Sequence, residues 1–147
     1  MDWIEEAKRI FNVNKPEHFT NFMHCDECAE HDETLKNADF DTIGLLQLGN
    51  PGWDPICFCS TDGKKYYMPA FIRVSLETID SDFYLAQFLF HLENDGSENK
   101  FVLSCNNEQR QFIVDFLEYF IEQYPELIDL NMCSDDILRV REIWLVV

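Results

Sequence analysis

Basic residues are scarce in this chain of 147 residues, which has 11 Lys and Arg against 28 Asp and Glu and a formal net charge of −17. Residues 1–73 carry 13 acidic and 7 basic side chains, and residues 74–147 carry 15 and 4, so both halves are acidic. Direct binding of nucleic acid is disfavoured because phosphates need a basic face, and an anionic membrane would repel the chain. We expect an acidic surface that serves solubility, or one that binds a basic protein partner or mimics nucleic acid.

Glycine, proline and long apolar runs are also rare. The 5 Gly and 5 Pro exclude collagen-like and low-complexity classes. No apolar run approaches the roughly 20 residues of a membrane span, and the N-terminal residues lack the basic and apolar regions of a secretory signal. We therefore expect a cytoplasmic protein whose 6 Cys are reduced thiols or metal ligands rather than a disulfide framework.

Hydrophobic side chains are present in globular proportion, at 46%, with 13 Phe, 5 Tyr and 3 Trp. Such a set can fill a sizeable core, which excludes disorder for most of the chain. The length suits one domain, and no repeat, linker or composition shift divides it, so we predict a single domain over residues 1–147.

Helical spacing of apolar residues dominates the chain. It predicts helices over 2–12, 25–37, 42–48, 69–78, 82–93, 108–123 and 135–145. The helix over 82–93 is apolar on nearly every side, so we expect it to be buried, with Phe88, His91 and, from the next helix, Phe116 in the core.

One short segment favours strands. The Asp62-Gly63 pair is typical of a hairpin turn, which would join strands over 56–60 and 65–67. Residues 101–103 could form a further strand or a buried link. The predicted fold class is mainly α (α+β): a single compact helical domain with one small β-hairpin.

A Cys-x-x-Cys-x-x-His segment preceded by His carries the chemistry of the sequence. Thiolate and imidazole are the ligands that zinc prefers in a tetrahedron. We predict a structural zinc held by Cys25, Cys28 and His31, with His24 or a distant thiol, Cys57 or Cys59, completing the set.

The same segment has other interpretations. On an α-helix His24, Cys28 and His31 share one face with Leu35, as inward-packed core residues would. A metal-dependent hydrolase built on His24, His31 and Asp32 is a further alternative, which would need an open coordination position.

A redox-active Cys-x-x-Cys is the least favoured interpretation of the segment. Such a pair requires a helix N-terminus and a lowered thiol pKa, whereas the carboxylates of the following turn would raise that pKa. The βαβ context of thioredoxin-like proteins is also missing from the sequence.

The loop over residues 49–55 contains two Gly and two Pro, so it must be ordered without being helix or strand. We predict Trp53 and Asp54 as partner-binding residues; the alternative is that Trp53 plugs the edge of the core. The sequence has no nucleophile elbow, Walker motif or Gly-x-Gly-x-x-Gly, and we predict no catalytic residue.

Four stretches together resemble a family of uncharacterised bacterial proteins, a domain of unknown function. They are Cys25-x-x-Cys28-x-x-His31-Asp32, Gly49-Asn50-Pro51-Gly52-Trp53-Asp54-Pro55, Tyr66-Tyr67-Met68-Pro69-Ala70 and Glu108-Gln109-Arg110. The likeness covers roughly residues 16–145. It implies a single bacterial domain and supplies no activity. Wider relatives keep the Tyr-Tyr-x-Pro-Ala and Glu-Gln-Arg stretches more generally than the Cys/His segment, which implies that the fold can stand without that segment.

From these observations we expect an acidic binding or interaction module with a structural zinc. An immunity or inhibitor role against a basic protein is one concrete version, supported by the charge. The alternative is a small metal-dependent hydrolase that uses the same His/Cys cluster.

Overall fold

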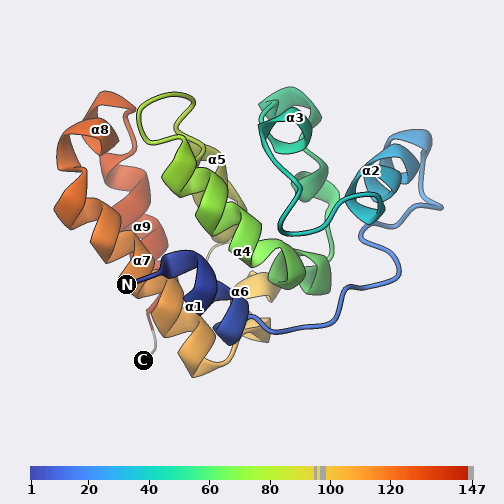
Figure 1. Ribbon diagram of the computed structural model, residues 1–147, viewed down its shortest axis with the longest axis horizontal. Coiled ribbons are helices and arrows are strands. Elements are labelled where there is room, and N and C mark those ends of the chain that lie inside the picture. Colours follow the sequence, from blue (N-terminus) through green and yellow to red (C-terminus); the bar gives the residue numbers. More distant parts are fainter. Residues whose placement is uncertain (95, 97–98, 146–147) are drawn as a thin grey trace. The chain divides into compact units, whose positions relative to one another are not determined.

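The protein is described by a computed structural model covering residues 1–94, 96 and 99–145 (Figure 1). Every regular element among these residues is a helix, which confirms the mainly α prediction. The chain divides into two compact units, residues 1–77 and 78–147, and each is described by itself. One domain over residues 1–147 stays a prediction. None of the described helices has the length and apolar character needed to cross a membrane.

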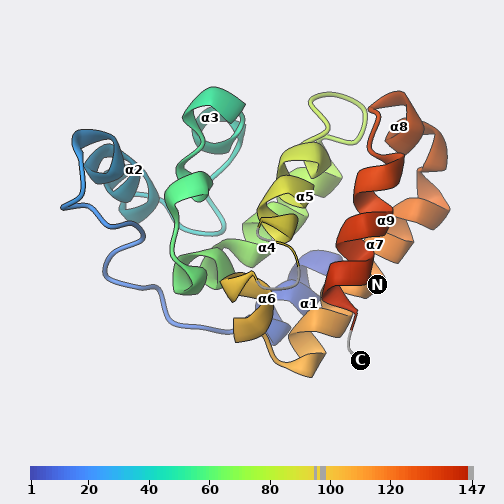
Figure 2. The same ribbon diagram turned by 180° about the vertical axis from the view of Figure 1, so that it is seen from behind.

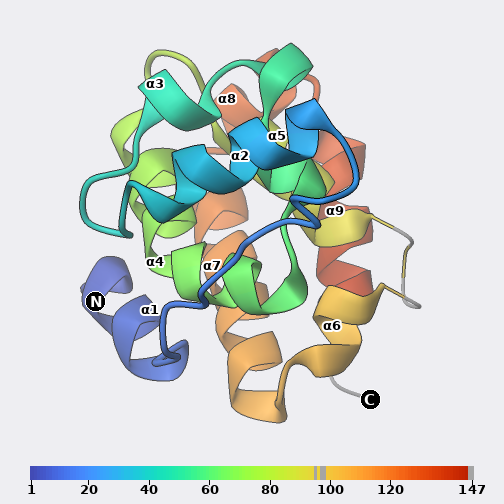
Figure 3. The same cartoon turned by 90° about the vertical axis from the view of Figure 1, so that its right-hand side faces the viewer.

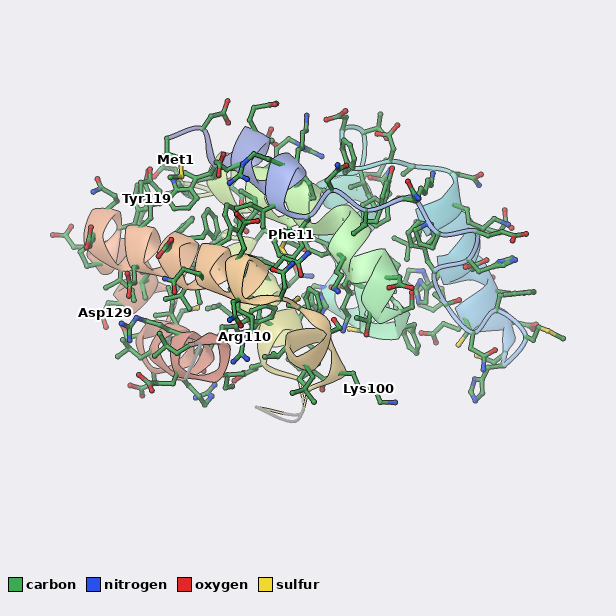
Figure 4. All side chains as sticks on the ribbon, turned by 90° about the horizontal axis from the view of Figure 1, so that it is seen from below. Met1, Phe11, Lys100, Arg110, Tyr119 and Asp129 are labelled. Atoms are coloured by element: carbon green, nitrogen blue, oxygen red, sulfur yellow. The ribbon has the colours of Figure 1, made fainter. Side chains whose placement is uncertain are left out.

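Unit 1 contains the helices α1 to α4 and two 3₁₀ turns. Their bounds are α1 Trp3–Ile10, α2 Asp26–Lys36, α3 Leu45–Leu48, η1 Pro51–Trp53, η2 Pro55–Phe58 and α4 Thr61–Glu77. Helix α1 packs against α4, and η2 packs against both α2 and α3. Phe11 follows α1 and is buried (Figure 4).

The predicted β-hairpin is wrong, because none of the described residues lies in a strand. The first strand, 56–60, begins in η2, and the turn and return strand form the start of α4. The Gly63 N–H donates to Ser60 Oγ at 3.1 Å, as a residue in the first turn does to a capping hydroxyl.

Gly63 has a packing role instead of a turn role. A Cβ built on it would lie 2.8 Å from Phe19 Cδ1 and 2.5 Å from Cys59 Sγ. Glycine is therefore needed at position 63 because Phe19 approaches the first turn of α4 closely. From the sequence alone, this use of an Asp-Gly pair cannot be distinguished from a hairpin turn.

Helix α4 also fixes the end of α2. The Tyr67 hydroxyl donates to the carbonyl oxygens of Leu35 and Ala38, and Tyr67 is fully buried. Lys15 Nζ donates to the Ala38 carbonyl at 2.6 Å and to that of Lys36 at 2.9 Å, so these carbonyl groups at the end of α2 have hydrogen-bond donors.

Pro69 lies inside α4 rather than at the start of a helix over 69–78.

Unit 2 contains α5 Leu85–Glu93, α6 Lys100–Ser104, α7 Asn107–Gln123, α8 Pro125–Leu130 and α9 Ser134–Trp144. Helix α9 packs against α5, α7 and α8 (Figure 2). Residues 101–103 thus belong to a helix, not to a strand, and α8 was not predicted. Phe88, His91 and Phe116 are buried, as predicted.

The Glu-Gln-Arg stretch serves the packing of unit 2. Gln109 completes a capping box with Asn106 at the start of α7. Arg110 on α7 (Figure 4) donates to the carbonyl of Leu145 at 2.8 Å and to those of Ile143 and Trp144 at 3.3 Å. The Arg110 side chain therefore provides hydrogen-bond donors for the backbone carbonyl groups at the C-terminal end of α9.

Candidate metal centre

Helix α2 begins one residue later than predicted, and this changes the position of Cys25. Cys25 has extended backbone angles and is the N-cap, and its Sγ accepts the Cys28 N–H at 3.4 Å. Figure 3 shows α2 with the segment that leads into it. Asp26 and Glu27 occupy the first turn, where carboxylates favour a helix start.

Three side chains meet at this helix start and could hold a metal ion: His24, Cys25 and Cys28. Their donor atoms all lie within 4.8 Å of one another. The two Sγ atoms are 3.3 Å apart, and His24 Nδ1 lies 3.7 Å from Cys28 Sγ. His24 and Cys25 are exposed, while Cys28 is buried, so an ion bound here would lie at the surface of unit 1.

The two thiols differ electrostatically. Hydrogen bonds from the backbone N–H of Cys28 and from the side chains of His24 and Cys28 lower the pKa of Cys25 below its ordinary value. The pKa of Cys28 is raised, first because its thiol donates to Cys25 and then because it is desolvated. The expectation that the carboxylates of the next turn would raise the pKa of the pair is therefore wrong for Cys25.

His31 is not a member of this group of three. It is buried, with its ring stacked on Phe58 at 5.0 Å and tilted against Trp53 at 4.7 Å. Its Nε2 lies 3.2 Å from a carboxylate oxygen of Glu27. Together with buried Cys28 and Leu35, it matches the core-packing interpretation of this helix face.

Asp32 serves the fold rather than the group of donors. It is buried; its Oδ1 accepts the N–H groups of Phe19 at 2.6 Å and Thr20 at 3.1 Å, and its Oδ2 lies 2.8 Å from His18 Nδ1. Burial acts to raise the pKa of Asp32, but these hydrogen bonds outweigh it and lower the pKa. The hydrolase set His24, His31 and Asp32 is thus not brought together.

The loop over 49–55 supplies Trp53 and Asp54 in different environments. Trp53 is 44% exposed, and its ring is tilted against that of His31; partner binding by Trp53 stays a prediction. Asp54 is buried and caps η2, its Oδ1 accepting the Ile56 N–H at 2.9 Å. This burial argues against Asp54 as a surface contact.

The distant thiols of Cys57 and Cys59 do not join the group at His24, Cys25 and Cys28. Partial desolvation raises the pKa of the Cys57 thiol, although the residue is exposed, and burial of the Cys59 thiol raises its pKa to about 12.

Comparisons of the chain with protein-family models, with curated proteins and with solved structures gave no match. The resemblance to a bacterial family therefore stays a prediction, and the case for function rests on the residues themselves.

Two features of the site were missed in the sequence, and only the first of them left a signal there. Asp26 and Glu27 are the acidic residues typical of a first turn, and they place the helix start directly after Cys25. The pairing of His18 with Asp32 joins residues 14 positions apart across an irregular segment. No periodic pattern connects such residues, so only the fold reveals the contact.

Proposed function

We propose that unit 1 is a zinc-binding interaction module whose ion is held by His24, Cys25 and Cys28 at the start of α2. The observation that carries the proposal is the convergence of one imidazole and two thiols within 4.8 Å. The soft thiolates and the imidazole together favour zinc over calcium or magnesium, which prefer oxygen ligands.

The spacing of the donor atoms supports this choice of ion. In a tetrahedral zinc site with Zn–S near 2.3 Å and Zn–N near 2.05 Å, two sulfurs lie about 3.8 Å apart, and sulfur and nitrogen about 3.6 Å apart. The corresponding distances here are 3.3 Å and 3.7 Å. Rotation of the exposed Cys25 side chain is enough to remove the difference, because Cys25 precedes the helix.

The surroundings of the group favour interaction. Phe22 and Met23, which directly precede the ligands, are 38% and 83% exposed, and Trp53 is also exposed in unit 1. Asp26, Glu30 and Glu33 are exposed along α2. An apolar segment beside an acidic helix suits a basic protein partner with an apolar contact, as an immunity or inhibitor role would require.

A metal-dependent hydrolase is the second candidate, and one observation favours it. The group contains three protein ligands, and no fourth is grouped with them among the described residues. A tetrahedral ion would then have one position for water or for a ligand from a partner. Cobalt substitution separates these cases, because added cyanide changes the absorption spectrum of an open site and leaves a closed one unchanged.

Metal analysis tests the proposal most directly. The full chain, purified without added zinc, is expected to carry close to one equivalent, and chelation is expected to lower its melting temperature, since metal binding contributes to folding. Cys28→Ser is expected to lose the zinc. Cys133→Ser is the matched control, because Cys133 is a buried thiol of unit 2 outside the group.

Two outcomes would contradict the proposal. One is metal-free protein that takes up no added zinc and melts at the same temperature with and without chelator. The other is a double variant, Cys25→Ser with Cys28→Ser, that retains one equivalent of zinc.

A further inference from the structure

Cys25 and Cys28 form an asymmetric pair of thiols. Their Sγ atoms lie 3.3 Å apart, closer than the 3.7 Å between Cys28 Sγ and His24 Nδ1. Cys25 is exposed, whereas Cys28 is 6% exposed. Cys25 also caps α2, with its sulfur accepting the Cys28 N–H. One sulfur is therefore accessible to a reagent in solution, and the other is accessible mainly to the first.

We propose that Cys25 and Cys28 are a reversible dithiol–disulfide pair that exchanges with small neutral or cationic disulfides. The inference goes beyond the proposed zinc site and does not depend on it, since the pair reacts in the metal-free protein. Zinc and the disulfide exclude each other because both use the same sulfur atoms.

Closing the disulfide requires little movement of the chain. A disulfide bond is about 2.05 Å long, so the two sulfurs must approach by only about 1.2 Å. Cys25 lies before the first helical residue, and its carbonyl accepts the Ala29 N–H at 3.0 Å. Rotation of the Cys25 side chain leaves that backbone bond in place, so α2 keeps its first turn.

The exchange proceeds in two balanced steps. Cys25 Sγ, the exposed sulfur of the pair, attacks one sulfur of the small disulfide, forms a mixed disulfide and releases one small thiol, which takes up the proton of Cys25. Cys28 Sγ, 3.3 Å from Cys25 Sγ, then attacks the sulfur of Cys25, closes the internal disulfide and releases the second small thiol, which takes up the proton of Cys28. Two protein thiols are oxidised, and one small disulfide is reduced to two thiols.

The charge around the pair selects the reagent. Asp26 and Glu27 follow Cys25 directly in the first turn of α2, and the whole chain carries a net charge of −17. An anionic disulfide is repelled by these charges, whereas a cationic one is attracted. Cystamine, a small disulfide with two ammonium groups, is therefore the probe of choice.

The test uses the full chain, reduced and treated with chelator, and then exposed to cystamine. Trypsin places Cys25 and Cys28 together in the peptide over 10–36, and Cys57 and Cys59 in the peptide over 37–64. Mass spectrometry is expected to show the first peptide lighter by two hydrogens, with no cysteamine attached. Cys28→Ser is expected to accumulate one cysteamine on Cys25, because nothing displaces it.

Cys25→Ser serves as the second variant, since Ser also caps helices and keeps α2 intact. It is expected to slow reaction at Cys28 by at least about tenfold, because the buried thiol has lost its accessible partner. Exposed Cys57 is the internal control and is expected to react more slowly than Cys25 in Cys28→Ser. The inference is overturned if Cys25 reacts no faster than Cys57, or if the parent protein accumulates cysteamine on Cys25 without the internal disulfide. Because zinc is absent, neither result bears on the metal site.

Discussion

The carboxylate of Asp32 in α2 accepts the backbone N–H of Phe19 at 2.6 Å and so connects α2 to a segment 13 residues earlier. Phe19 also packs against Tyr66 and Tyr67 of α4, with ring centroids 6.0 and 5.3 Å away, and its carbonyl accepts the Ser60 N–H at 2.7 Å. One buried carboxylate thus links α2 to α4 through Phe19. Breaking this link is expected to loosen the support of the candidate metal centre.

Asp32→Asn is expected to lower the free energy of unfolding by about 1–3 kcal/mol at pH 7, because it removes the charge from a buried acceptor of several hydrogen bonds. The pKa of Asp32 is lowered in the folded protein, so the native state favours the carboxylate. Its contribution is complete above the ordinary Asp pKa of about 4 and is lost as the pH falls through the lower folded value. Urea unfolding between pH 7 and pH 3 measures both effects.

The control for Asp32→Asn is Glu30→Gln, at an exposed position of α2. Its effect is expected to stay within about 0.5 kcal/mol at every pH. The assignment to Asp32 fails if the difference between the parent protein and Asp32→Asn does not shrink at the acid end of the series.

The long helices could be predicted because their apolar residues repeat with the helical period. The buried positions of Phe88 and Phe116 followed from that repeat, and both are buried in unit 2. The sequence could not distinguish a hairpin from the start of α4, because an Asp-Gly pair can occur both in a hairpin turn and in the first turn of a helix. Gly63 is needed here because Phe19 packs closely against it, and Phe19 lies more than forty positions earlier in the chain.

The sequence predicted that Cys and His side chains form the candidate site, but it did not predict which of them lie together. Spacing grouped His31 with the two Cys, whereas the structure places His31 between Trp53 and Phe58. The core-packing interpretation placed His24 on a face of the helix, but His24 precedes the N-cap. Ligand convergence depends on where a helix begins, and a shift of one residue moved Cys25 from the helix to its cap.

Gly63→Ala is expected to destabilise the protein although alanine is the better helix former. An unobstructed exchange of Gly for Ala inside a helix would gain about 1 kcal/mol. Here the new Cβ would lie 2.8 Å from Phe19 Cδ1, so we expect a net loss of about 1–3 kcal/mol. Gly44→Ala is the matched control, since its Cβ meets nothing within 4 Å and its φ is −153°. Equal melting temperatures for the two variants would contradict the packing role of Gly63.

Phe116→Ala is expected to cost about 3–5 kcal/mol, because Phe116 is fully buried and its removal leaves a cavity. Its ring lies edge-on to that of Phe88 at 6.4 Å and to that of Phe120 at 5.1 Å. Phe90→Ala on α5 is the control, because Phe90 is 55% exposed and loses less burial. Thermal melts of the two variants that coincide would mean that Phe116 does not belong to the core of unit 2.

Added salt is expected to raise the melting temperature of the free protein. With a net charge of −17, repulsion between carboxylates opposes the folded state at low salt. The Debye length falls from about 30 Å at 0.01 M to about 8 Å at 0.15 M, so most of this repulsion is removed over that range. The exposed ion pairs Lys8–Asp41 and Arg139–Glu93 stabilise the folded state and are weakened by salt, but exposed pairs are worth only about 0–1 kcal/mol each.

Melting in sodium chloride, with chelator present to exclude a metal effect, measures the balance between repulsion and these ion pairs. Sorbitol of equal osmolarity is the uncharged control. A melting temperature that falls with salt would contradict the prediction and show that attraction between charges outweighs repulsion in the folded protein.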